Sequence, residues 1–326
     1  MAPETINIDG RTFVQADQLP IAEWPCVLAE RPQPTLTLKD DDLFLLTDTL
    51  GNITGSCMGD DRSVSMGLFC NDTRYLSRLE LQIDGRSPIL LSSTADKGFV
   101  LSVLCTNPHI GENIKAESIG IKRELVLNGG LFEEVEVANY STNPVSFEIS
   151  LSFDADFVDL FEIRGFNRDH RGNLLRMVIP EKKIPGVENS KCLTDGSQDL
   201  KEVQRSEENA ENLNGEDEQS SIALISHMPA ISAPDEFSLA YQGLDGSLLE
   251  SRISFVDRMP DFLSGNTAIW KLELQSHQKL TLGYRLQMLI SGRPASTVNA
   301  PVTLAQAKAA ELMEEQTWRQ QVTQIR

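Results

Sequence analysis

Alternating hydrophobic and polar residues run along most of this chain and predict β-strands. The clearest case lies at 145–157, where Phe147, Ile149, Leu151 and Phe153 occupy every second position. Successive side chains of a strand point to opposite faces, so these residues define a core face. We expect the serines and acids between them to face water, which predicts a strand with one buried and one solvated side.

Turn signals separate further strands of the same kind. Asn128-Gly129-Gly130 predicts a hairpin between "IKRELVL" and "LFEEVEVAN". Asp84-Gly85 predicts another after "LELQI", with the return strand beginning at Ile89, and Leu50-Gly51-Asn52 predicts a third. Short extended segments continue from residue 223 to residue 290. At least about ten strands follow, so we expect a mainly β protein.

Two segments depart from this pattern. Residues 181–221 are acidic and polar without periodic apolar spacing, which predicts a disordered insertion inside one β-domain. Residues 302–326, rich in Ala, Glu and Gln, predict a helix that either folds back on the sheet or contacts a partner. The expected plan is an N-terminal extension over 1–35 and a β-domain over 36–300, followed by the helix over 302–326.

Charge and composition narrow the class of protein. The 326 residues are 40% hydrophobic and carry a net charge of −19, which favours a globular protein and argues against nucleic acid or an anionic membrane as partner. Residues 1–30 lack a basic start with an apolar core, and no apolar run reaches the roughly eighteen residues of a membrane span. We therefore expect a cytoplasmic protein.

Cysteine and histidine spacing gives no sign of a cofactor. The five cysteines form no CxxC pair, so we expect free thiols, and the four histidines form no HxH or HExxH motif. Neither a GxSxG nucleophile turn nor a glycine-rich phosphate loop is present in the sequence. We expect neither a metal nor another cofactor.

Acidic residues offer one candidate for chemistry, in the segment "DADFVDLFEIRG". Glycoside cleavage uses two carboxyl groups about 5 Å or about 6.5–9.5 Å apart. Asp154 and Asp156 are two positions apart on one strand face, roughly 6–7 Å, so they could line a cleft. The alternative, which we prefer, is that both solvate the outer face of the sheet.

A basic patch follows, "RGFNRDHRGNLLR" at 164–176, which contains Arg164, Arg168, Arg171 and Arg176. These arginines either form ion pairs with the preceding acids or position a ligand rich in hydroxyl or carboxylate groups, because the guanidinium offers planar, forked donors. A second polar cluster, Asp72-Thr73-Arg74, stands in "GLFCNDTRYLS" just before a strand. It is open to interpretation as a site or as a turn.

Two sequence blocks carry a resemblance to a known family. "GLFCNDTRYLSRLELQIDGRSPILLSS" and "IKRELVLNGGLFEEVEVANYSTNPVSFEISLSFDADFVDLFEIRG" resemble the N-terminal domain of bacterial glycogen-debranching-type enzymes, the amylo-α-1,6-glucosidase-related group. The likeness covers most of 36–300. It implies a large antiparallel β-supersandwich that, in full-length relatives, precedes an (α/α)-barrel carrying the glycosidase acids. The helix at 302–326 would then connect to a barrel that this chain lacks.

The resemblance assigns residues only modestly. Asp72, Thr73 and Arg74 match the family's DTR triplet, and Arg164 with Gly165 matches its RG pair. The catalytic residues are unknown, since the resemblance places them on the barrel. We expect Asp72 and Arg74 to form a charge pair that fixes a turn facing the barrel. The candidate substrate or interface contacts are Asp72, Thr73, Arg74, Asp156, Arg164 and Arg168.

Three functional hypotheses follow. The first is a non-catalytic β-domain of an α-glucan debranching glycoside hydrolase, working with a catalytic barrel in cis or in trans. The second is a stand-alone α-glucan-binding or scaffolding module that acts with a separate catalytic protein. The third keeps hydrolysis in this chain through Asp154 and Asp156.

Overall fold

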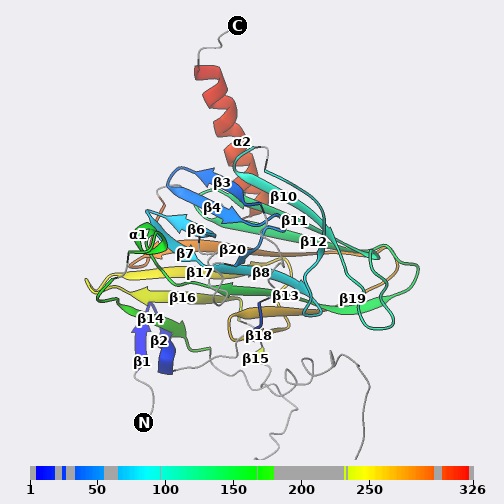
Figure 1. The fold of residues 1–326 in the computed structure, drawn as a ribbon, viewed down its shortest axis with the longest axis horizontal. Coiled ribbons are helices and arrows are strands. Elements are labelled where there is room, and N and C mark those ends of the chain that lie inside the picture. The colour runs from blue at the N-terminus through cyan, green and yellow to red at the C-terminus, as the bar shows by residue number, and fades with distance from the viewer. Residues whose placement is uncertain are drawn as a thin grey trace, which may run out of the picture.

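The described part of the chain contains three antiparallel β-sheets and ends in a long helix (Figure 1). The computed structural model describes residues 5–18, 24–26, 34–54, 65–95, 97–166, 168–179, 231–232, 234–296 and 303–322. The expected insertion at 181–221 lies outside these residues. A mainly β, antiparallel fold with a C-terminal helix is confirmed.

The largest sheet has eleven strands and includes both ends of the β-region. Its central part contains the hairpin predicted at Asn128-Gly129-Gly130, and Leu127 pairs with Leu131 across it. Residues 5–15, within the expected N-terminal extension, form two strands that continue this sheet. In spatial order the strands are β1 (Thr5–Ile8), β2 (Arg11–Gln15), β14 (Asn173–Met177), β16 (Glu236–Gln242), β17 (Leu248–Val256), β20 (Lys279–Ile290), β12 (Leu131–Asn139), β11 (Ile119–Leu127), β10 (Val100–Thr106) and β9 (Ile89–Thr94), with β21 (Arg293–Pro294) also pairing β20.

Two smaller sheets complete the fold. The six-stranded sheet runs β15 (Ile231–Ser232), β18 (Phe262–Ser264), β19 (Thr267–Leu274), β13 (Val145–Asp154), β8 (Arg78–Ile83) and β5 (Ile53–Thr54). The four-stranded sheet runs β3 (Leu36–Asp40), β4 (Leu43–Thr47), β6 (Gly67–Cys70) and β7 (Thr73–Leu76). The helical segments are η1 (Ala16–Gln18), α1 (Leu160–Ile163) and α2 (Leu304–Gln321).

The main core lies between the two larger sheets. Phe153 of β13 packs edge-on against Tyr284 of β20, with ring centroids 5.1 Å apart, and against Phe237 of β16 at 5.7 Å. These contacts are the aromatic geometry expected of a filled interior. The residues that alternate along 145–157 form one wall of this core, as the pattern predicts.

The opposite face of β13 differs from the expectation. Ser150 and Ser152 are buried rather than solvated. They lie beside Gln82 and Glu80 of β8, and the segment at 24–26 contacts the same face: Trp24 Nε1 donates to Gln82 Oε1 at 3.0 Å. This face therefore contacts a chain segment more than fifty positions from β8, which strand periodicity cannot reveal.

Two predicted hairpins are also wrong in their pairing. The turn after β8 exists, since Ile83 bridges to Arg86, but β9 pairs with β10 and β8 pairs with β13. The turn at Leu50–Asn52 likewise leads from β4 into β5, and these strands belong to different sheets. Both turns move the chain between sheets, so neither closes a hairpin.

Candidate functional site

The predicted site begins at the hairpin between β6 and β7. Asn71 and Asp72 have φ of 46° and 63°, and Cys70 pairs with Thr73 across them. Positive φ at both central positions is the backbone of a tight two-residue hairpin, and Asn and Asp tolerate it better than most residues. The side chains of Asn71 and Asp72 are exposed, so this cluster is a turn.

Arg74 points inward from β7 and binds Asp156, not Asp72. Its Nε donates to Asp156 Oδ1 at 3.0 Å, its Nη2 forms an ion pair with Asp156 Oδ2, and its Nη1 donates to the carbonyl of Met66 at 3.0 Å. No ion pair joins Arg74 to Asp72, although both residues are described, so the expected charge pair is wrong. The side chain of Asp72 is exposed at the turn, whereas the guanidinium of Arg74 is buried beneath the loop that follows β13.

A glycine makes room for this guanidinium. A Cβ at Gly67 would lie 2.5 Å from Cδ of Arg74, closer than side-chain carbons approach. The backbone adds to the attachment, because the amide of Arg74 donates to the carbonyl of Val158 at 2.8 Å. Strand β7 is thus fixed to the loop at 155–158 through both main chain and side chain.

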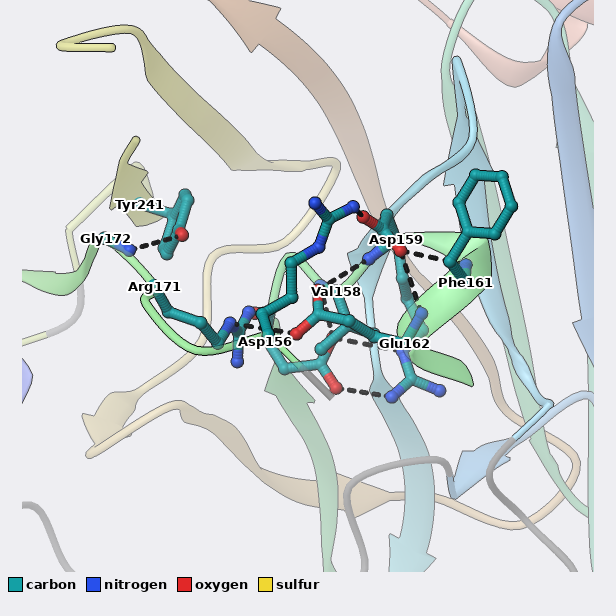
Figure 2. A network of polar contacts seen from close by, with 10 residues as sticks. Asp156, Val158, Asp159, Phe161, Glu162, Arg171, Gly172 and Tyr241 are labelled. Carbon is teal, nitrogen blue, oxygen red and sulfur yellow. Dashed lines mark hydrogen bonds and ion pairs between the residues drawn. The ribbon is translucent and has the colours of Figure 1, made fainter. Parts of the chain in front are cut away.

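Helix α1 starts at the end of this loop. Asp159 is its N-cap: Oδ1 accepts from the amides of Phe161 and Glu162 at 2.8 and 2.9 Å, and the amide of Asp159 donates to Glu162 Oε2 at 3.2 Å (Figure 2). The amide of Leu160 donates to the carbonyl of Asp72 at 3.0 Å, and Thr73 bridges to Asp159. The β6–β7 turn therefore lies against the first turn of α1.

Arginines of the basic patch neutralise the acids around α1. Arg168 forms an ion pair with Asp159, and Arg171 Nε lies 3.2 Å from Glu162 Oε1. Arg171 also donates to the carbonyl of Asp156 at 2.7 Å and stacks over Tyr241 at 5.6 Å (Figure 2). The ion-pair interpretation of this patch holds for these two arginines.

Arg164 behaves differently. It ends α1, where its amide donates to the carbonyls of Leu160 and Phe161. Its side chain is exposed, and it makes no hydrogen bond or ion pair with the described residues. The structure brings Thr73, Arg74, Asp156 and Arg168 into one network and leaves the side chains of Asp72 and Arg164 at its rim.

Asp154 and Asp156 do not share an environment. Asp154 is the last residue of β13, and burial raises the pKa of its carboxyl, opposed by a hydrogen bond from the amide of Ala155 at 2.9 Å. Asp156 lies beyond the strand and is held by Arg74. Within the described ranges no group of three or more His, Cys, Asp and Glu side chains is placed to hold a metal ion.

Sequence reasoning missed two features of this network, the capping box of α1 and the contribution of Tyr241. The sequence pattern D-x-x-E before an apolar residue, here Asp159 to Glu162, is typical of a capping box and could have predicted the start of α1. Tyr241, whose hydroxyl accepts from the amide of Gly172 at 2.7 Å, gave no signal, because it lies on β16, far along the chain.

Cysteine chemistry differs from the expectation. Cys70 and Cys105 are free and buried, and burial raises the pKa of each thiol to about 11. Cys26 is disulfide-bonded. The prediction that all the cysteines are free thiols is therefore wrong. No helix among the described residues combines the length and hydropathy needed to cross a bilayer.

Comparison with known proteins places the chain in a family. A search of curated proteins finds no match. Among solved structures, 22 chains match; one, a provisionally assigned kojibiose phosphorylase from the human microbiome, has a TM-score of 0.42 at 10% identity, and the match covers 88% of this chain and 33% of that one. This chain thus spans about a third of that protein. The family described as the N-terminal domain of some glycogen debranching enzymes matches residues 38–285, more than half of the chain. This chain belongs to that family of N-terminal domains.

Proposed function

We propose that this chain is the non-catalytic N-terminal β-domain of an α-glucan debranching glycoside hydrolase of the amylo-α-1,6-glucosidase type, and that it supports a catalytic (α/α)-barrel in cis or in trans. One observation carries this proposal: the carboxylates of Asp156 and Asp159, beside α1, are already engaged. Arg74 binds Asp156, and Arg168 with two helix amides binds Asp159. Glycoside hydrolysis needs one carboxyl that holds a proton and a second that faces the substrate. These groups instead fix a hairpin to a helix.

The surface around α1 is the proposed contact with the barrel. Phe161 and Phe166 are 58% and 64% exposed and pack edge-on, with ring centroids 6.0 Å apart. Asp72 and Arg164 are both exposed, carry charges of opposite sign and are joined to α1 through backbone hydrogen bonds. Exposed aromatic residues with a charged rim are typical of a protein interface. In this arrangement the DTR and RG residues position the interface.

The coding region after Arg326 tests this proposal. We expect an (α/α)-barrel in the same frame or in a neighbouring one. The barrel made alone should hydrolyse a branched limit dextrin poorly, and adding this chain or restoring the fusion should recover activity. Phe161→Ser together with Phe166→Ser should weaken that recovery, while Leu244→Ser, at an exposed leucine elsewhere, should not. A barrel fully active without this chain would contradict the proposal.

A second candidate, a stand-alone α-glucan-binding module, is favoured by a hollow of about 250 Å³ beside the site. It is lined by polar side chains of the kinds that can hydrogen-bond to sugar hydroxyls, namely Gln15, Asp17, Arg171, Asn173 and Tyr241. The ring of Tyr241 already stacks with Phe157, with centroids 5.9 Å apart, and the guanidinium of Arg171 lies 5.6 Å from its centroid, which leaves less of the ring for a sugar. Retarded migration in a glycogen-containing native gel, lost in Asn173→Ala, would support this candidate over the first.

The proposed compartment is the cytoplasm, a reducing compartment that is consistent with the free thiols of Cys70 and Cys105. The disulfide at Cys26 opposes it, because disulfides persist mainly in oxidising compartments. Thiol alkylation in intact cells, followed by a non-reducing gel, distinguishes a cytoplasmic from an oxidising compartment. Alkylation of Cys26 without prior reduction supports the cytoplasm, and a Cys26 that reacts only after reduction contradicts it.

A further inference from the structure

Helix α2 packs on the β-sheets only through its first half. Leu304 and Ala307 are buried against Phe99, Val126 and Phe132 of the largest sheet and its edge. Beyond this stretch the helix runs away from the sheets, and Trp318 is 61% exposed (Figure 1). The attachment of α2 to the β-domain therefore rests on about two helical turns, so each residue in these turns has a large share in the free energy of docking.

The last buried position of that stretch is an acid. Leu304, Ala307 and Glu311 follow the spacing of one helix face, and Glu311 is only 8% exposed. A carboxylate in a position that periodicity gives to an apolar residue must be paired, or else lose its charge, because burying an unpaired charge is costly. The groups around Glu311 decide which of these applies.

No cation faces Glu311 among the described residues. Asn128 Nδ2, from the β11–β12 hairpin, donates to its Oε1. Burial raises the pKa of Glu311 to about 7, partly offset by that bond and increased by the nearby carboxylates of Asp40, Glu314 and Asp41. The nearby lysines are engaged elsewhere: Lys39 donates to the carbonyl of Asp41, Lys308 pairs with Glu124, and Lys97 lies 4.0 Å from Glu315.

The partner of Glu311 has an unsatisfied oxygen. Asn128 Oδ1 is buried and has no hydrogen-bond partner. The amide of the next residue, Gly129, donates to Asp40 Oδ2 at 2.8 Å and is therefore not available to this oxygen. An ionised Glu311 has only acceptors and cannot satisfy this oxygen, whereas a protonated carboxyl carries one O–H donor. Such an orphan oxygen costs free energy unless a donor is supplied.

We propose that Glu311 is protonated when α2 is docked, with its carbonyl oxygen accepting from Asn128 Nδ2 and its hydroxyl donating to Asn128 Oδ1, so that a single proton latches α2 to the β-domain. The acid and the amide then form two parallel hydrogen bonds, and every buried polar atom of the pair is satisfied. Deprotonation removes the donor and places a negative charge beside Asp40. The latch concerns α2 and the β11–β12 hairpin alone and does not rest on the proposed function.

The direction of the pH effect follows from the proton count. The docked helix holds a proton that the undocked helix, with an ordinary glutamate pKa near 4.5, releases. Docking is therefore strongest below that value, weakens as the pH rises toward 7, and levels off above it. One proton changes the docking equilibrium by up to about tenfold per pH unit in this window.

Hydrogen exchange of the α2 amides, measured by mass spectrometry on the whole chain from pH 5.5 to 8, tests the latch. Protection relative to the rates of an unstructured peptide should fall by about tenfold per pH unit up to about pH 7 and then stay constant. Glu311→Gln keeps both hydrogen bonds without a titrating group, so its protection should not vary with pH. Glu314→Gln, at an exposed position of the same helix, should retain the fall but end it at a slightly lower pH, because its carboxylate no longer raises the pKa of Glu311.

Two results would overturn the latch. One is protection of α2 that does not change with pH in the native chain, and the other is a fall in Glu311→Gln as steep as the native one. If Glu311→Gln does not fold, the latch is tested in the native chain instead, by following the side-chain ¹³C resonance of Glu311 as the pH is varied. A titration midpoint near 7 supports the latch, and one near the ordinary glutamate value contradicts it.

Discussion

Two arginine–carboxylate pairs, one in the core and one at the sheet edge, show how the same chemistry serves different purposes. Arg123 and Glu133 have side chains only 1% and 0% exposed, and Asn52, Tyr284 and backbone carbonyls satisfy their remaining groups. Arg74 is similarly buried, but Asp156 is 24% exposed. The first pair joins the turn at Asp48–Asn52 to β11 and β12. The second holds a surface of α1 that other molecules can reach.

The largest expected effect comes from the core pair. Arg123→Met leaves Glu133 buried without its partner, which costs about 3–5 kcal/mol of unfolding free energy. Urea titrations measure this loss. Lys122→Met, at the neighbouring exposed cation, should change stability by less than about 0.5 kcal/mol. Equal effects of the two substitutions would contradict the distinction between core and edge.

The next largest effect is a pH-dependent change in unfolding free energy at Asp48, in the turn that Arg123 contacts. Burial raises the pKa of Asp48 to about 6, so its contribution to stability is complete below the ordinary value of 3.8 and is lost as the pH rises through 6. Asp48→Asn keeps an oxygen for the amides of Leu50 and Asn52. Relative to the native chain it should gain about 2 kcal/mol between pH 4 and pH 8.

Urea titrations at four pH values across that range measure the gain. Asp41→Asn, at an exposed aspartate of the β3–β4 turn, is the control and should follow the native curve. Parallel curves for Asp48→Asn and the native chain would show that Asp48 titrates as an ordinary aspartate.

The edge pair should matter less than the core pair. Arg74→Gln removes the ion pair with Asp156, and because Asp156 can be hydrated we expect a loss of about 1–2 kcal/mol. Arg164→Gln, at the exposed end of α1, serves as the matched control and should lose less than about 0.5 kcal/mol. A loss for Arg74→Gln as large as that for Arg123→Met would remove the contrast.

The smallest effect belongs to the outermost pair. Arg168 is more than half exposed, so its ion pair with Asp159 is screened by water and salt. Arg168→Gln should cost less than about 1 kcal/mol, and the difference should disappear in 1 M salt. Thermal unfolding at low and high salt measures it. A cost that persists at high salt would mean that Arg168 packs as well as pairs.

Local features of the fold were predictable and distant ones were not. The Asn128–Gly130 hairpin and the inward face of β13 follow from neighbouring residues, so periodicity and turn chemistry identify them. The partner of Arg74 is 82 positions away, and Trp24, which contacts Gln82 on the face of Ser150 and Ser152, is also distant along the chain. Asp72, only two positions from Arg74, was the local choice and was wrong. Sequence patterns fix which side of a strand is apolar, but they do not identify what covers it.

The central claim is that the carboxylates beside α1 position a surface and do not hydrolyse glucan. Glucose release from a branched limit dextrin by the purified 326-residue chain tests it most directly, with Asp156→Asn assayed in parallel. We predict no release by either protein above a heat-inactivated control. Release by the native chain that Asp156→Asn abolishes would contradict the claim and place catalysis in this domain.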